Sequence, residues 1–184
     1  MTDIQIGVVG CAGRMGLNLL RQIHGTDGCA IAGGSERPGH EAIGRDLGEM
    51  AGLGAQSIGG IGGIVAEGDP RAMFERSDIV LDFTVPSATV AHVALAVESN
   101  TKMVIGTTGT TAEDDATIAK AAQSVAIMRE GNMSLGVNVM AVLTRQMAQY
   151  LDADFDIEIV EMHHRYKVDA PSGTALLLGR AAAA

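Results

Sequence analysis

The residues best suited to chemistry lie close together near the carboxyl end of the sequence. His163 and His164 are adjacent, and Lys167 comes four residues after His163. An imidazole can exchange a proton near neutral pH, and an ammonium can hold an anion. Residues 169–174 (DAPSGT) read as a loop that opens onto a helix, whose free N–H groups also attract anions. The segment therefore predicts a site that holds an anion and moves a proton.

A strand is expected to carry the two histidines. Residues 155–160 (FDIEIV) alternate apolar and acidic side chains, as a half-buried strand does. Successive side chains of a strand point to opposite faces, so the two imidazoles are not expected to share one metal ion or one proton. A histidine pair at a strand end is also a common surface feature, but Lys167 and the helix start favour a site.

The amino end carries a glycine-rich turn. Residues 4–9 (IQIGVV) predict a buried strand, and Gly10, Gly13 and Gly16 follow it before an apolar helical pattern. In a dinucleotide-binding turn such glycines allow the tight turn, the approach of backbone to a pyrophosphate, and close packing of helix on strand. The glycine motif alone is weak evidence, but its place between a strand and a helix favours a dinucleotide-binding fold.

An acidic residue follows the second predicted strand. Residues 29–34 (CAIAGG) end at Ser35, and Glu36 lies 20 residues after Gly16, about where a carboxylate meets the adenosine ribose hydroxyls. Arg37 beside it could accept a 2′-phosphate. The pair predicts that both NADH and NADPH are tolerated, although a solvated Glu-Arg turn is the alternative.

The middle of the chain repeats strand and helix with short turns. This order predicts an α/β fold, a Rossmann-like doubly wound parallel sheet. Ligands of such sheets bind at the carboxyl ends of the strands, here Phe83 and the turn 106–109 (GTTG), whose hydroxyl and N–H groups are expected to be free for a cofactor. His92 is expected to be an ordinary helix residue. The expected strands are 79–84, 102–105 and 125–128, and the expected helices are 71–75, 86–98 and 110–124.

Two stretches have a different character. Residues 39–68 are rich in glycine and predict a loop region with a short strand near 64–65. Residues 135–150 predict a long helix that leads into the strand of the two histidines. We expect a dinucleotide-binding domain over 1–132 and the start of an α+β substrate-binding and oligomerisation domain over 133–184.

Composition limits the partners. The net charge of −9 argues against nucleic acid and anionic membranes. Cys11 and Cys29 form no disulfide framework and no metal-binding spacing, so a reducing cytoplasm and no bound metal are expected. We find no leader pattern and no apolar run of membrane-spanning length, so secretion and membrane insertion are not expected.

With both ends considered, the sequence resembles the dihydrodipicolinate reductases of the diaminopimelate route to lysine, over essentially the whole chain. The most specific part is 161–175 (EMHHRYKVDAPSGTA), which matches the His-His-x-x-x-Lys-x-Asp-Ala-Pro-Ser-Gly-Thr signature of that family. Supporting matches are GCAGRMG at 10–16, Glu36-Arg37, DFT at 82–84, GTTG at 106–109 and NMSLGVN at 132–138.

The resemblance implies roles for individual residues. A hydride from NADH or NADPH would go to a cyclic, unsaturated dicarboxylate imine, with His163 and Lys167 as catalytic residues. The implied substrate contacts are His164, Ser172, Gly173 and Thr174. The implied cofactor contacts are Gly10, Cys11, Ala12, Gly13, Arg14, Met15, Glu36, Arg37, Phe83, Gly106, Thr107, Thr108, Glu130, Gly131, Asn132 and Met133. A homotetramer is implied for the full-length protein.

The chain departs from the family pattern in two places. Glu130 and Gly131 stand where many members carry a pair of small residues, so cofactor contacts there would come from the backbone. Met133 places a thioether where those members have an aromatic side chain. Members of the family also continue past the Ser-Gly-Thr helix with further strands. We therefore expect that the sequence is truncated at its carboxyl end.

Two other functions stay open. A dinucleotide-binding module that senses redox state would explain the glycines and Glu36, but it gives no purpose to His163 and Lys167. A different nicotinamide enzyme on the same fold, such as a semialdehyde dehydrogenase, would need a nucleophilic cysteine at a strand end, and Cys11 in the glycine turn is badly placed for that.

Overall fold

The computed structural model describes residues 3–58, 63–151, 154–165 and 170–184. The chain forms two compact units, Met1–Arg129 and Glu130–Ala184. Each unit is described by itself below. The division into a cofactor domain over 1–132 and a substrate domain over 133–184 stays a prediction. Lys167 and Asp169 lie outside the described residues.

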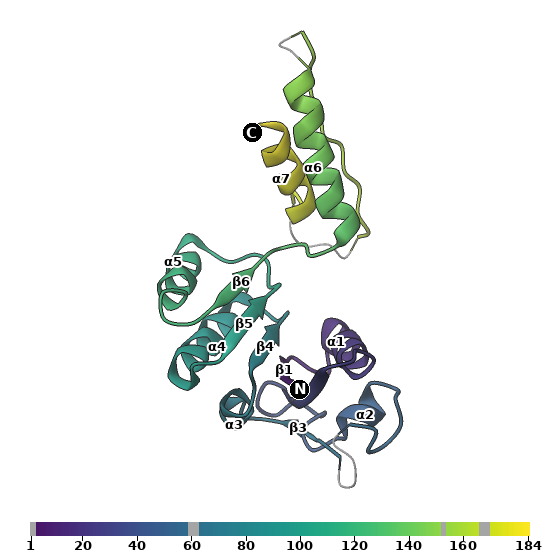
Figure 1. The fold of residues 1–184 in the computed structure, drawn as a ribbon, viewed down its shortest axis with the longest axis vertical. Helices are drawn as coiled ribbons and strands as arrows, with labels where there is room; N and C mark the ends of the chain where they lie inside the picture. Colours follow the sequence, from purple (N-terminus) through teal and green to yellow (C-terminus); the bar gives the residue numbers. More distant parts are fainter. Residues whose placement is uncertain (1–2, 59–62, 152–153, 166–169) are drawn as a thin grey trace. The chain divides into compact units, whose positions relative to one another are not determined.

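The first unit is built on a six-stranded parallel sheet (Figure 1). Its strand order is β3-β2-β1-β4-β5-β6, so the chain starts in the middle of the sheet and winds outward in both directions. This confirms the predicted α/β doubly wound fold. The strands are β1 (Ile4–Val9), β2 (Cys29–Ser35), β3 (Ala66–Glu67), β4 (Ile79–Asp82), β5 (Lys102–Ile105) and β6 (Ile127–Arg129).

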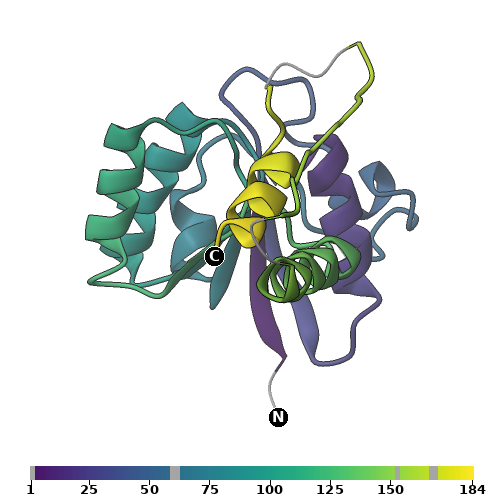
Figure 2. The same cartoon turned by 90° about the horizontal axis from the view of Figure 1, so that it is seen from above.

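Helices cover both faces of this sheet (Figure 2). The neighbours Val8 and Val9 on β1 belong to two separate hydrophobic clusters, because successive strand side chains point to opposite faces. Val8 packs in the cluster that contains Leu20 of α1, and Val9 packs with Phe74 of α3 and Val93 of α4. The helices are α1 (Arg14–His24), α2 (Leu47–Met50), α3 (Arg71–Glu75), α4 (Pro86–Ser99) and α5 (Ala112–Ala121).

The glycine-rich stretch, residues 39–68, contains more regular structure than the sequence predicts. The short strand β3 lies at Ala66–Glu67, and Val65 forms an isolated antiparallel bridge with Asp46. The one-turn helix α2 starts after Asp46, whose carboxylate accepts a hydrogen bond from the Glu49 N–H at 2.8 Å. A single turn is too short to show helical periodicity, so the prediction of a loop was wrong there.

Local hydrogen bonds set two further boundaries. Helix α5 begins at Ala112 because Thr111 and Asp114 form a capping box. Strand β6 begins at Ile127 because the Val125 N–H still donates to the Ala121 carbonyl at the end of α5. Both elements exist as predicted, with ends shifted by these contacts.

The second unit holds helix α6 (Leu135–Tyr150) packed on helix α7 (Gly173–Ala182). The bounds of α6 are those that the sequence predicts. The prediction of a strand over 155–160 was wrong, because residues 154–165 form no strand in the structure. A strand is defined by hydrogen bonds to a neighbour, and no described segment of this unit pairs with 155–160.

Within the described residues, the structure contains no helix that is both long enough and apolar enough to cross a bilayer.

Candidate functional site

The glycine turn brings the start of α1 close to the end of β1. Gly10 has a φ of +66°, a conformation that favours glycine. A Cβ at Gly16 would overlap the Gly10 carbonyl oxygen and the Cys11 backbone. Among the described residues, no side chain caps α1 at its N-cap, Gly13. The N–H groups of the first helical turn can therefore face an anion, which fits the pyrophosphate of a dinucleotide.

Glu36, at the end of β2, contacts the glycine turn directly. Its Oε1 accepts a hydrogen bond from the Ala12 N–H at 3.0 Å, and its Oε2 accepts one from the Arg37 N–H at 3.3 Å. Arg37, the next residue in the chain, is exposed. The structure thus brings together the two sequence features that predict dinucleotide binding.

Cys11 lies in the same turn and is fully buried. Burial, with a smaller contribution from the negative charge of Glu36, raises the pKa of the Cys11 thiol to about 12. A thiol that stays protonated is a poor nucleophile. This argues against a semialdehyde dehydrogenase that would use Cys11.

The turns after β4 and β5 lie next to each other, because these strands are paired in parallel. The ring of Phe83 occupies the space that a side chain at position 106 would need, so glycine at Gly106 allows the two turns to touch. Thr108 is exposed, whereas Thr107 is buried. The Thr107 hydroxyl bonds to Asp82, Thr84 and Thr89, so the expectation that it is free for a cofactor was wrong.

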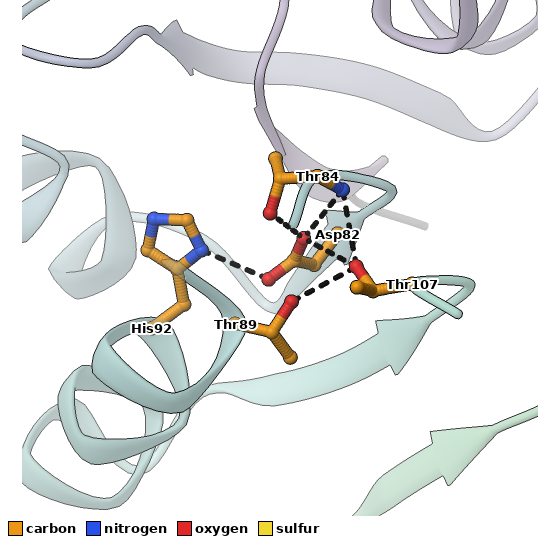
Figure 3. A network of polar contacts seen from close by, with 5 residues as sticks. All are labelled: Asp82, Thr84, Thr89, His92 and Thr107. Atoms are coloured by element: carbon orange, nitrogen blue, oxygen red, sulfur yellow. Dashed lines mark hydrogen bonds and ion pairs between the residues drawn. The ribbon is translucent and has the colours of Figure 1, made fainter. Parts of the chain in front are cut away.

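Asp82 is the centre of a buried polar network that joins these two turns (Figure 3). Its Oδ2 lies 2.8 Å from Nδ1 of His92 on α4. Burial alone would raise the pKa of Asp82, but the hydrogen bond and charge of His92, together with hydrogen bonds from Thr84, hold that pKa below its usual value. The expectation that His92 is an ordinary helix residue was wrong. The sequence did contain a signal for this contact, because Asp82 lies in a strand that is predicted to be buried. A buried carboxylate needs hydrogen-bond partners.

In the second unit, Glu161 connects a catalytic candidate to the start of α7. Its Oε2 lies 3.1 Å from Nδ1 of His163, and its Oε1 accepts a hydrogen bond from the Ser172 N–H at 2.7 Å. The hydroxyl of Ser172 accepts a hydrogen bond from the Ala175 N–H at 3.1 Å and so caps α7. Glu161 is a site residue that the sequence did not predict. His164 is exposed, and Lys167 lies outside the described residues.

The loop before α6 approaches the same helix start. The Asn132 amide donates to the Thr174 hydroxyl at 2.9 Å. The Glu130 carboxylate accepts hydrogen bonds from the N–H groups of Gly131 and Asn132, at 2.8 and 3.4 Å. These two N–H groups are engaged within the loop. Glu130 and Asn132 therefore hold the loop in shape, and Asn132 links it to the predicted substrate contact Thr174.

Two family models cover most of the chain. The model described as "Dihydrodipicolinate reductase, N-terminus" matches residues 4–133, and the one described as "Dihydrodipicolinate reductase, C-terminus" matches residues 136–184.

Curated relatives point to the same family. The chain is 51% identical to a 4-hydroxy-tetrahydrodipicolinate reductase of Chelativorans sp. over 184 residues, which are all of this chain and 64% of that protein. It is 52% identical to the protein of the same name from Parvibaculum lavamentivorans over 181 residues, which are 98% of this chain and 65% of that one. The chain thus spans about two thirds of the length of these relatives.

A solved structure of this kind is similar to the chain. The dipicolinate-bound dihydrodipicolinate reductase from Paenisporosarcina sp. TG-14 matches with a TM-score of 0.74 and 26% identity, over 99% of this chain and 66% of that one. An amine dehydrogenase from Mycobacterium smegmatis, 21% identical with a TM-score of 0.53 over 70% of this chain and 38% of that one, shares the fold. From the family models and these relatives, the chain belongs to the dihydrodipicolinate reductase family.

Proposed function

We propose that the protein is a reductase that transfers a hydride from NADH or NADPH to a cyclic dihydrodipicolinate-type dicarboxylate in the diaminopimelate route to lysine. The observation that carries the proposal is the contact of Glu161 with both His163 and the start of α7. This contact joins a proton-exchanging group to an anion-attracting helix end, in a chain whose first unit carries a dinucleotide-type turn. The names of the relatives support the same reaction.

The first unit supplies the cofactor site. The N–H groups at the start of α1 would bind the pyrophosphate, and the Glu36 carboxylate would accept hydrogen bonds from ribose hydroxyls. The exposed Arg37 would pair with a 2′-phosphate. Phe83, Gly106 and the backbone of Thr107 and Thr108 would contact the nicotinamide half. When bound, the nicotinamide supplies the hydride.

The Glu161 carboxylate would orient the proton donor. Its Oε2 lies 3.1 Å from Nδ1 of His163, an ion-pair contact that would hold the imidazole ring in place when the ring is protonated. The opposite ring nitrogen, Nε2, would be the atom that exchanges a proton with the substrate. Hydride addition to a conjugated ring builds negative charge, which a positioned imidazolium can neutralise by giving up its proton.

The substrate would be held by its carboxylates. Ser172 fixes the first turn of α7 through its side-chain cap, and the N–H groups of Gly173 and Thr174 in that turn would bind an anion. Lys167 and His164 would add positive partners from the same segment. A structurally similar reductase that was solved with bound dipicolinate supports a dicarboxylate ligand.

We place the protein in a reducing cytoplasm, because Cys11 and Cys29 are both free thiols. We propose that it works as a homo-oligomer, a homotetramer by its family, with no nucleic-acid or membrane partner, in keeping with its net charge of −9.

The test uses this chain alone and this chain joined to the segment by which the Chelativorans relative exceeds it in length. Substrate is generated enzymatically from aspartate semialdehyde and pyruvate, and NADH oxidation is followed by absorbance. We expect cofactor binding by both proteins and substrate-dependent oxidation by the longer one. Tight NADH binding with no substrate-dependent oxidation by either protein would favour the redox sensor instead.

A further inference from the structure

We propose that Asp82, held by His92, is a positioning residue that fixes the two strand-end turns of the cofactor site. This inference rests on the proposed function, because it assumes that the turns after β4 and β5 contact the nicotinamide cofactor. Neither Asp82 nor His92 is itself expected to touch the reacting atoms. Their effect would pass through Thr84 and Thr107.

Asp82 receives hydrogen bonds from both turns at once (Figure 3). Its Oδ1 accepts from the Thr84 N–H at 3.0 Å, from the Thr84 hydroxyl at 2.6 Å and from the Thr107 hydroxyl at 3.2 Å. Its Oδ2 faces Nδ1 of His92 at 2.8 Å. One side chain therefore holds the backbone of the first turn and the side chain of the second.

Thr107 completes the link to α4. Its hydroxyl donates to Asp82 and accepts from the Thr84 N–H at 3.1 Å and from the Thr89 hydroxyl at 2.9 Å. Thr89 and His92 lie on the same helix, which follows the first turn. Helix α4 is thus bonded to both turns, and their relative position is set by four side chains: Asp82, Thr89, His92 and Thr107.

A carboxylate suits this position better than a neutral group. Burying a charge is costly, and the Asp82 side chain is fully buried. An ionised carboxylate accepts only and can take about four hydrogen bonds, whereas an asparagine would direct two N–H donors at groups that already donate. The four contacts of Asp82 match that capacity. We infer that the charge is kept because it can hold four donors together.

His92 supplies the contact to the second carboxylate oxygen, Oδ2. Because the carboxylate is an acceptor, the Nδ1 atom of His92 must carry a proton. The ring also lies against the hydrophobic cluster, with its centroid 6.2 Å from that of Phe74. A variant that removes the ring therefore loses packing as well as the hydrogen bond, and the test must separate these two effects.

The pair His92→Asn and His92→Leu separates them. The two new side chains have nearly the same shape, and only the asparagine amide can donate from about the position of Nδ1. His24, an exposed residue at the end of α1, serves as the matched control with the same two changes. Dissociation constants for NADH are measured by titration on the 184-residue chain, with thermal unfolding recorded for each variant.

We expect His92→Leu to bind NADH about tenfold more weakly than His92→Asn, the cost of one lost charge-assisted hydrogen bond. The two His24 variants should bind equally. Nitrogen-15 spectra of the unmodified chain should show a proton on Nδ1 of His92, with the signal assigned by its loss in His92→Asn.

The outcomes are distinct. Equal NADH affinity of the two His92 variants, or an Nδ1 atom without a proton, would overturn the inference and leave the proposed function standing. Failure of the unmodified chain to bind NADH or NADPH would overturn the proposed cofactor site and the inference with it. Should His92→Leu not fold, the nitrogen-15 result on the unmodified chain and the affinity of His92→Asn, expected close to that of the unmodified chain, still decide the question.

Discussion

The backbone N–H of Ala12 donates to the Glu36 carboxylate across 3.0 Å, so the end of β2 is tied to the glycine turn that follows β1. The contact fixes an acidic group next to the helix end that would bind a pyrophosphate. It is therefore the structural link between the two parts of the proposed nucleotide site, the phosphate turn and the ribose acid.

Replacing Glu36 by alanine should weaken NADH binding by about tenfold, because a carboxylate that accepts ribose hydroxyl bonds is lost. The control is Glu41→Ala, which removes an exposed acid nearby in the sequence. Calorimetric titration of both variants measures the effect. An unchanged affinity in Glu36→Ala would mean that the carboxylate serves only the turn.

Replacing Arg37 by alanine should weaken NADPH more than NADH, because only NADPH carries the phosphate that a guanidinium would pair with. Arg45→Ala, at another exposed arginine, should affect neither cofactor. The comparison needs both cofactors titrated under the same conditions. A uniform loss for the two would show that Arg37 does not face the 2′ position.

Replacing Gly16 by alanine should lower the free energy of unfolding by about 1–3 kcal/mol, because the new Cβ would overlap the Gly10 carbonyl and force α1 away from β1. In contrast, Gly136→Ala in α6, where a Cβ meets only the Ser134 hydroxyl at 4.0 Å, should raise stability by about 0.5–1 kcal/mol. Urea unfolding measures both. Equal effects would contradict the close approach at Gly16.

The contribution of Asp82 to stability should depend on pH in a defined direction. Its folded-state pKa lies below the ordinary value of 3.8, so the folded protein binds this proton more weakly than the unfolded chain does. The stabilisation is therefore complete above the unfolded value and is lost as the pH falls through the folded value. The stability difference between the unmodified chain and Asp82→Asn should be constant above about pH 5 and shrink below about pH 4. A difference that grows on acidification would contradict the assignment.

The sequence predicted the helices and strands that depend on the pattern of neighbouring residues. The apolar strand over β1 and the long periodic helix over Leu135–Tyr150 appear with the expected bounds. The prediction of a strand over 155–160 was wrong for a different reason. Alternation of apolar and acidic side chains indicates an extended chain, but a strand also needs a neighbouring strand to bond to, and the pattern does not identify one. Helix α2 was missed because its stability comes from the Asp46 cap and from packing, not from periodicity.

The same distinction holds for the candidate site. The glycine turn and Glu36 could be predicted because their spacing is set by one strand-helix-strand unit. Glu161 and His92 were missed because each contacts the side chain of another residue, His163 and Asp82 respectively, and such contacts become visible only when the elements are folded. His92 and Asp82 are ten residues apart and lie on different elements.

In the proposed reaction, His163 exchanges the proton that accompanies hydride transfer. This role is tested by the steady-state kinetics of His163→Ala in the chain joined to the additional segment of the Chelativorans relative, with His24→Ala as control. We expect kcat to fall about a hundred- to ten-thousandfold in His163→Ala while NADH affinity is unchanged. Turnover equal to that of the unmodified protein would contradict it.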